Sequence, residues 1–247
     1  MNNYFVILAA GKGTRFSKNK LKQFYNYKNK QIIEHSIDKA IKSKLFKKVI
    51  VVTSNSKKLI NRTFPKSIKV INGGKARSDS SLKALKYIKK FKPKNVLIHD
   101  AARPDFSIKL LNKLIKELKY NKAVIPIVKS KDSIKYKSKS KFFNLNKKNS
   151  FLTQTPQAFR FIDLYDLAIK NIQKVSDDAS LFINQNKKIK YVKGENQNNK
   201  ITFFEDIKTI KTYFGIGFDI HRLIKNKKLY LGGTRIPYHS GLKGHSD

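Results

Sequence analysis

Two glycines and two basic residues follow the first apolar run of this 247-residue chain. The run at residues 4–10 leads into Gly11 and Gly13, where backbone N–H groups can approach a polyphosphate closely. Arg15 and Lys22 come next and supply fixed positive charge to the same oxygens. Two glycines alone are weak evidence, because most such turns only reverse the chain. With the two cations beside them, the pattern indicates a nucleoside triphosphate site.

A carboxylate follows another buried run. Residues 96–98 deliver His99 and Asp100, while the run at residues 68–71 ends at Gly73 and Gly74. Because ligands bind beyond the carboxyl ends of the strands in parallel sheets, we expect these positions to share one site with the glycine turn. The plainer alternatives are that Asp100 caps the following helix and that His99 is a packed strand-end residue rather than an acid or base.

Apolar runs of strand length alternate with helical patterns along most of the chain. Further strands are expected at residues 49–52 and 123–128, and helices at 31–42, 78–91, 107–118, 161–171, 179–184 and 205–213. In the helix at 31–42, Ile33, Ile37, Ala40 and Ile41 form the predicted inward stripe. Repeated β-α-β order predicts an α/β fold of Rossmann-like type, with a mainly parallel sheet and helices on both faces.

Residues 129–150 break this alternation and predict a protruding β-hairpin arm, with strands at 133–136 and 141–145. Such an arm would hold Ile134, Tyr136, Phe142 and Phe143 in water unless something covers them. A second copy of the chain is the economical partner, so we expect a homodimer.

The net charge of +39 raises the alternative of a nucleic-acid-binding protein. Only seven of the 55 basic residues are arginines, the preferred readers of base edges, and the lysines are scattered rather than gathered in one stripe. We therefore expect no dedicated nucleic-acid role. The chain has no cysteine, no N-terminal signal segment and no apolar run near the roughly 20 residues of a membrane helix, so we expect a cytoplasmic protein without a membrane partner.

Five motifs in order resemble one family. They are Leu8-Ala9-Ala10-Gly11-Lys12-Gly13-Thr14-Arg15-Phe16, Lys22-Gln23-Phe24, Gly73-Gly74 with Arg77 and Ser80, Ile98-His99-Asp100-Ala101-Ala102-Arg103-Pro104, and Gln154-Thr155-Pro156-Gln157-Ala158-Phe159. Over about residues 3–213 the chain resembles 2-C-methyl-D-erythritol 4-phosphate cytidylyltransferases, of the nucleotide-diphospho-sugar transferase type. The resemblance implies transfer of CMP from CTP to the sugar-alcohol phosphate, with Mg²⁺ as cofactor and pyrophosphate as the second product.

The resemblance also implies roles for particular residues. Arg15 and Lys22 match the pair that stabilises charge on the α-phosphate, and Asp100 matches the Mg²⁺ ligand. Lys147 and Lys200 match positions that hold the phosphate of the acceptor. The implied nucleotide and acceptor contacts are Ala9, Ala10, Gly11, Gly13, Gly74, Ser80, Asp100, Ala101, Arg103 and Ser133.

The chain departs from the family's pattern at three places. Lys147 stands where the family has an arginine, so the charge is kept but the bidentate fork is not. Lys75 and Ala76 follow the double glycine, where relatives often carry polar or acidic groups near the base. Residues 176–179 are a softened form of the family's Thr-Asp-Glu-Ala.

This chemistry requires no general base. The attacking group is a phosphate oxygen, which is largely ionised near neutral pH because its second pKa is about 6. What is left for the protein is to position the reactants and to neutralise charge while the attacking oxygen and pyrophosphate lie in line.

The tail after Tyr213 resembles the beginning of 2-C-methyl-D-erythritol 2,4-cyclodiphosphate synthase. We therefore expect a first domain at residues 1–213 and the start of a second at 214–247. Asp219 and His221 match two ligands of a zinc-type divalent metal, and His245 with Ser246 matches a substrate-phosphate segment. Since two protein ligands fall short of the usual three, we expect no cyclising activity from this piece.

One enzymatic alternative is a sister cytidylyltransferase that acts on another polyol phosphate, such as ribitol 5-phosphate. The synthase-like tail argues against it, because such fusions join neighbouring steps of one pathway.

The nucleic-acid alternative can be tested directly. We expect CTP to raise the thermal stability of the chain at moderate salt, because it fills a built phosphate site, and duplex DNA to leave stability unchanged. Differential scanning fluorimetry with each ligand measures this. Stabilisation by DNA alone would contradict the enzymatic interpretation.

Overall fold

A computed structural model describes residues 2–17, 21–54, 65–171, 175–207, 215 and 217–244. The chain divides into two compact units, Met1–Lys208 and Thr209–Asp247. The boundary expected between residues 213 and 214 lies outside the described residues and stays a prediction.

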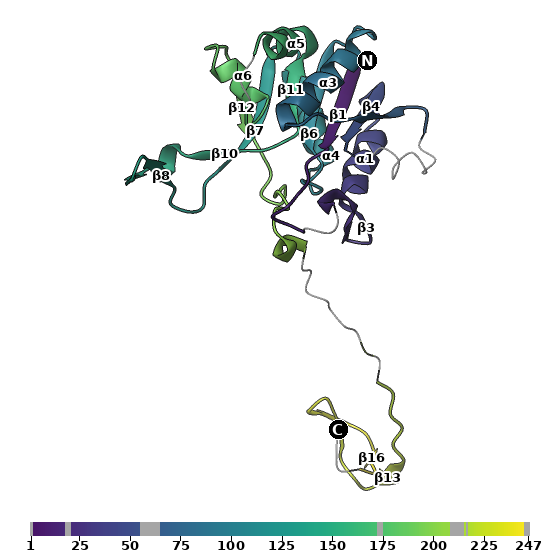
Figure 1. Ribbon diagram of the computed structural model, residues 1–247. Coiled ribbons are helices and arrows are strands. Elements are labelled where there is room, and N and C mark those ends of the chain that lie inside the picture. The colour runs from purple at the N-terminus through teal and green to yellow at the C-terminus, as the bar shows by residue number, and fades with distance from the viewer. Residues whose placement is uncertain are drawn as a thin grey trace. The chain divides into compact units, whose positions relative to one another are not determined.

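A mixed eight-stranded sheet forms the centre of the first unit (Figure 1). Strands β1, β4, β5 and β6 pair in parallel, β12 pairs in parallel with β7, and β10 and β11 run antiparallel to their neighbours. The mainly parallel α/β architecture is confirmed, whereas β10, β11 and β12 were not expected. The sheet order is β10 (Phe151–Thr153), β7 (Ala123–Lys129), β11 (Gln157–Arg160), β6 (Asn95–Asp100), β1 (Asn3–Ala9), β4 (Lys48–Thr53) and β5 (Ile68–Asn72), with β12 (Lys190–Lys193) beside β7.

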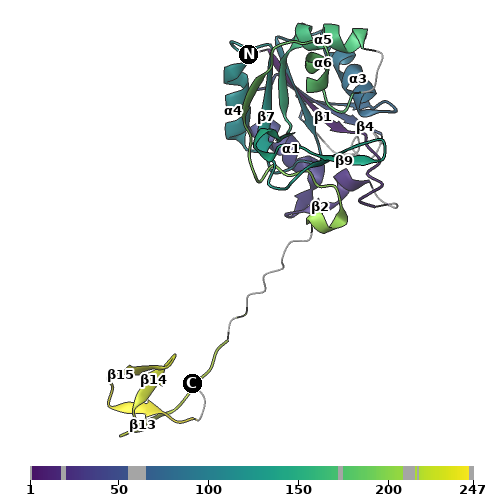
Figure 2. The same cartoon turned by 90° about the vertical axis from the view of Figure 1, so that its left-hand side faces the viewer.

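Helices cover both faces of this sheet (Figure 2). On one face lie α1 (Ile32–Lys42) and α4 (Ile108–Glu117); on the other lie α3 (Arg77–Lys89), α5 (Phe161–Lys170) and α6 (Ala179–Ile183). Side chains of a strand alternate between faces, and β1 follows this rule. Phe5 and Ile7 pack in the core on the α1 and α4 side, while Tyr4 and Val6 pack in the core on the α3, α5 and α6 side, and all four are fully buried.

The inward stripe of α1 is narrower than expected. Ile33, Ile37 and Ala40 are buried, but Ile41 is 37% exposed. Ile41 lies one position past Ala40, about 100° further around the helix, which turns it away from the sheet. The prediction for Ile41 was therefore wrong.

The expected hairpin arm is present. Strands β8 (Lys135–Ser138) and β9 (Lys141–Asn144) pair antiparallel and project away from the sheet in Figure 1. Tyr136, Phe142 and Phe143 are each more than half exposed. The arm returns to β10 through the short 3₁₀ turn η2 (Lys147–Asn149).

Shorter elements complete the chain. In the first unit these are η1 (Lys22–Phe24), β2 (Asn26–Tyr27), β3 (Lys30–Gln31) and η3 (Phe204–Ile207). Of the helix expected at 205–213, residues 208–213 lie outside the described part. In the second unit, β13 (Leu223–Lys225) pairs with β16 (Ser240–Leu242), and β14 (Leu229–Leu231) pairs with β15 (Thr234–Ile236). Within the described ranges, no helix combines the length and apolarity needed to cross a membrane.

Candidate functional site

Parallel pairing brings the glycine turn and Asp100 to one edge of the sheet. Leu8 of β1 lies opposite Asp100 of β6 in the register, and the Ala101 N–H donates to the Leu8 carbonyl at 3.0 Å. Ala9 lies opposite Thr53 of β4 on the other side. The three strands thus end together, as the sequence predicted.

The Lys22-Gln23 step is packed onto the glycine turn. Buried Gln23 donates from Nε2 to the Ala9 carbonyl at 2.5 Å. Gly13 has φ +65°, and a Cβ there would lie 3.1 Å from Lys22 Cβ. A side chain at residue 13 would be strained as well as crowded. These contacts explain the spacing between the turn and Lys22.

A second glycine turn packs on the first. A Cβ on Gly73 would lie 2.3 Å from Ala10 Cβ and 3.0 Å from Ser80 Oγ. The Gly74 N–H donates to Ser80 Oγ at 3.0 Å, and Ser80 is buried on the first turns of α3. The absence of a side chain at Gly73 is therefore what allows the loops after β1 and β5 to touch.

Asp100 is the negative centre of the site. Its Oδ1 accepts from Arg77 Nε at 3.0 Å, and its Oδ2 accepts from Lys200 Nζ at 2.8 Å. Burial by itself would raise the pKa of Asp100, but Arg77 and Lys200 outweigh it and hold this pKa well below its ordinary value. Asp100 is ionised at neutral pH, and it does not cap the following helix, because Ser107 is the N-cap of α4.

Lys22 lies beside the same group of charges. Its Nζ donates to the Ile201 carbonyl at 2.6 Å. Burial lowers the pKa of Lys22, and the positive charges of Lys200 and Arg15 lower it further. We call Arg15, Lys22, Asp100 and Lys200 the strand-end cluster. Three cations around one carboxylate favour a polyanionic ligand.

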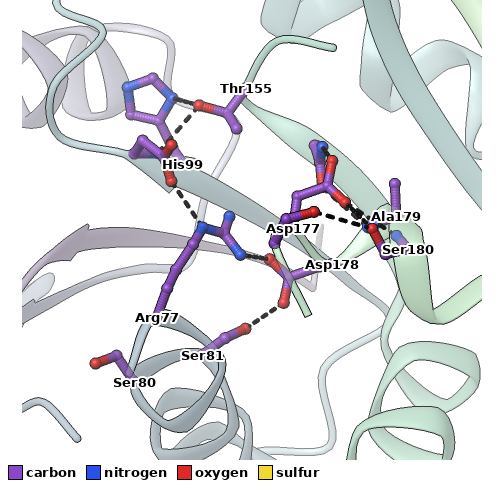
Figure 3. A network of polar contacts seen from close by, with 12 residues as sticks. Arg77, Ser80, Ser81, His99, Thr155, Asp177, Asp178, Ala179 and Ser180 are labelled. Atoms are coloured by element: carbon purple, nitrogen blue, oxygen red, sulfur yellow. Dashed lines mark hydrogen bonds and ion pairs between the residues drawn. The ribbon is translucent and has the colours of Figure 1, made fainter. Parts of the chain in front are cut away.

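The Gln154-to-Gln157 motif supports this cluster through hydrogen bonds to the backbone of Asp100 and to Asn198. Thr155 Oγ1 accepts from the Asp100 N–H at 3.0 Å and lies 3.0 Å from His99 Nδ1 (Figure 3). The Thr155 carbonyl accepts from Asn198 Nδ2 at 2.8 Å, and the Asn198 carbonyl accepts from Arg103 at 2.8 Å. Thr155 and Asn198 therefore connect the end of β6 to the segment that contains Lys200. The sequence motif alone did not reveal this role.

His99 is a packed strand-end residue, as expected. It is fully buried, and burial lowers its pKa to about 3, so the ring is neutral. Its Nε2 lies 3.1 Å from the Arg103 carbonyl. This contact assigns the proton to Nε2 and leaves Nδ1 to accept from Thr155.

The structure brings most of the predicted site residues together and leaves two apart. Ser133 and Lys147 are exposed and belong to the arm region, where no described contact links them to the strand-end cluster. The residues that gather at the ends of β1, β5 and β6, or in the segments packed on them, are Ala9, Ala10, Gly11, Gly13, Arg15, Lys22, Gly74, Ser80, Asp100, Ala101, Arg103 and Lys200.

The strand-end cluster offers one carboxylate, a donor set that suits a Mg²⁺ ion shared with substrate phosphates. Among residues whose positions are described, no three His, Asp or Glu side chains group together. Mg²⁺ is commonly bound through one or two carboxylates, with substrate phosphates supplying further oxygens. Asp100, ionised at the edge where a triphosphate would lie, is such a carboxylate.

Two of the predicted zinc-type ligands lie close together in the second unit. Asp219 Oδ2 lies 3.2 Å from His221 Nε2, but the described residues add no third ligand. His245 and Ser246 lie outside the described residues. We derive no chemistry from this pair.

Two family models match consecutive parts of the chain. Residues 4–215 match the family described as 2-C-methyl-D-erythritol 4-phosphate cytidylyltransferase (IspD), and residues 212–247 match the YgbB family. The chain is 51% identical to the bifunctional enzyme IspD/IspF of Pelagibacter ubique, over 100% of this chain and 67% of that protein. It is 35% identical to a 2-C-methyl-D-erythritol 4-phosphate cytidylyltransferase of Thermosipho melanesiensis, over 83% of this chain and 94% of that one.

Solved structures of proteins from the same two groups, single-domain and bifunctional, also match the chain. The bifunctional IspDF of Campylobacter jejuni matches with a TM-score of 0.74 and 31% identity, covering 100% of this chain and 66% of that one. The 4-diphosphocytidyl-2C-methyl-D-erythritol synthase of Anaerococcus prevotii matches with a TM-score of 0.73 and 31% identity, covering 83% and 92%. This chain therefore spans about two thirds of the bifunctional proteins that it matches.

The packing of the two glycine turns predicts a specific loss of stability. Gly73→Ala should lower the free energy of unfolding by about 1–3 kcal/mol, because the new Cβ would overlap Ala10. Gly11→Ala is the matched control, since a Cβ at Gly11 meets nothing within 4 Å, and it should change stability by less than about 0.5 kcal/mol. Urea denaturation measures both. Equal effects of the two substitutions would contradict the packing argument.

Proposed function

The chain belongs to the 2-C-methyl-D-erythritol 4-phosphate cytidylyltransferase family, and we propose that the strand-end cluster carries out its reaction. The enzyme is a nucleotidyltransferase that transfers CMP from CTP to 2-C-methyl-D-erythritol 4-phosphate in isoprenoid precursor biosynthesis. The observation that carries the assignment to the cluster is its composition, three cations around one ionised carboxylate beside a glycine turn.

Lys22 and Arg15 act on the α-phosphate in this proposal. Negative charge on the phosphate oxygens rises as the acceptor's oxygen approaches, and preorganised cations stabilise it without a proton transfer. The Lys22 ammonium is already bonded to the Ile201 carbonyl, and the next residue, Gln23, is fixed to the Ala9 carbonyl. Burial, and then the positive charges of Lys200 and Arg15, lower the pKa of Lys22, and a triphosphate would supply negative charge that offsets that repulsion.

Asp100 would hold Mg²⁺ together with the phosphates of CTP. When bound, this cation would neutralise phosphate charge. The chain's part is to keep the Asp100 carboxylate ionised through its contact with Arg77, and to fix its backbone at the edge of the sheet through the N–H bond to Thr155.

Lys200 serves the acceptor in this proposal. Its side chain is 43% exposed, so its ammonium can leave Asp100 and turn toward the acceptor's phosphate. Arg103, and Ser133 with Lys147 on the arm, would complete the acceptor side. We also infer a cytoplasmic homodimer, for which the exposed aromatic residues of the arm are the support.

The activity is tested by measuring pyrophosphate release from CTP and Mg²⁺. We expect rapid release with 2-C-methyl-D-erythritol 4-phosphate and slow release with ribitol 5-phosphate. A preference for ribitol 5-phosphate would overturn the assigned acceptor.

Removing either cation of the α-phosphate pair should slow transfer while the fold is kept. We expect Lys22→Ala and Arg15→Ala each to lower kcat by about 10²–10³, as for loss of one preorganised donor at a developing charge. Lys30→Ala is the control, because Lys30 is exposed and pairs with Asp38, and no described contact links it to the cluster. A folded Lys22→Ala or Arg15→Ala enzyme with near-normal kcat would refute the roles given to these residues.

The arm should hold two copies together. We expect a dimer in sedimentation velocity at micromolar concentration, because Tyr136, Phe142 and Phe143 otherwise leave apolar surface in water. A double substitution, Phe142→Ser with Phe143→Ser, should shift the species toward the monomer. A monomeric unsubstituted protein would count against the arm as an interface.

A further inference from the structure

The two oxygens of Asp100 have partners of different kinds. Oδ1 is bonded to Arg77, whose side chain is 22% exposed, and Oδ2 is bonded to Lys200, whose side chain is 43% exposed. One partner is thus held within the fold and the other lies near solvent on a flexible stem.

Arg77 is anchored on its far side by a second carboxylate. Its Nη1 donates to Asp178 Oδ2 at 2.7 Å, and Asp178 is almost completely buried (Figure 3). Ser81 Oγ donates to Asp178 Oδ1 at 2.5 Å. Arg77 and Ser81 both belong to α3, while Asp178 lies directly before α6. The guanidinium therefore connects three elements, α3, α6 and the end of β6.

Counting charges shows what happens when Lys200 leaves. Arg77 and Lys200 together balance the two carboxylates of Asp100 and Asp178. If Lys200 turns to an acceptor phosphate, Arg77 alone faces both carboxylates, and Asp100 Oδ2 is left with an unbalanced negative charge. A divalent cation bound with the nucleotide would restore the balance at that oxygen.

We propose that Arg77 is a positioning residue that fixes Asp100 through Oδ1 and so keeps Oδ2 available for exchange between Lys200 and the divalent cation. The proposal rests on the function proposed above, in which Asp100 holds Mg²⁺. Asp178, which itself accepts a hydrogen bond from Ser81, holds Arg77 in place.

Two substitutions separate this role from simple charge. Arg77→Lys keeps a positive charge, but an ammonium lacks the planar fork that spans both carboxylates. Asp178→Asn keeps the shape and an acceptor for Ser81, yet removes the charge that anchors Arg77, so the guanidinium is free to take both oxygens of Asp100. The matched controls are Arg160→Lys, where Arg160 bonds only the Lys119 carbonyl among described side-chain contacts, and Asp163→Asn, where Asp163 pairs with Lys122.

The experiment measures CTP binding by calorimetry without acceptor, once with Mg²⁺ and once with EDTA. For the unsubstituted enzyme we expect a clear gain in CTP affinity from Mg²⁺. In Arg77→Lys and Asp178→Asn this gain should shrink about tenfold or more, the usual effect of losing a residue that orients a metal ligand. Affinity in EDTA should change much less, and the controls should retain the full gain.

Several outcomes would overturn the proposal. A retained magnesium-dependent gain in either folded variant would do so, as would an equal loss of affinity with and without the metal. If neither variant folds, Arg77 serves the fold rather than the metal ligand, and the proposal also fails. Absence of any gain in the unsubstituted enzyme would refute the magnesium site itself, while pyrophosphate release would still report separately on CMP transfer.

Discussion

The parallel pairing of β1 with β4 and β6 is the constraint on which the rest of the site depends. β1 is buried on both faces, so its register with its neighbours is held by two hydrophobic cores at once. A shift of one residue would exchange the two sets of side chains between the cores. The same register places Asp100 opposite Leu8, directly before the glycine turn. The packing of the sheet thus sets the distance between the glycine turn and the Asp100 carboxylate.

Two cations of the strand-end cluster are held by groups of the chain itself. Lys22 bonds the Ile201 carbonyl and Lys200 bonds Asp100. Since these ammonium groups and Arg15 repel one another, each contact offsets part of that repulsion. In the function proposed above, a triphosphate would replace these local partners with stronger negative charge. In the proposed reaction the two ammonium groups would already lie near their working positions, which lowers the cost of ordering them on binding.

The Gln154-to-Gln157 motif and Asn198 serve the site through the backbone. Gln154 donates to the carbonyls of Glu195 and Asn198, which ties the segment before Lys200 to the sheet. Thr155 accepts from the Asp100 N–H. Gln157 donates to Asp177 at 2.7 Å and accepts from the Ala179 N–H at 3.1 Å, which fixes the start of α6 next to Asp178. One short motif therefore orients Asp100 directly and supports Lys200 and Asp178 indirectly.

The local sequence pattern by itself determined the parallel strands β1, β4, β5 and β6 and the helices between them. The glycine turns, the buried strands and the amphipathic helices can be read from apolar runs and spacing, because each depends mainly on its own residues. Even the exposed hairpin could be predicted, because residues 129–150 break the alternation of strands and helices. The family motifs added roles for residues that no periodicity distinguishes from other lysines, such as Lys200.

Only the tertiary structure decided the remainder. β10, β11 and β12 are three or four residues long, and they become strands because the edges of β6 and β7 offer them partners. The Arg77–Asp178 bond joins residues 101 positions apart, and no local pattern announces it. The family resemblance implies roles for Ser133 and Lys147 beside Asp100, but they lie on the arm, because the chain between 129 and 150 leaves the sheet. Residue types and spacing determine which groups can do chemistry, whereas long-range pairing determines which of them meet.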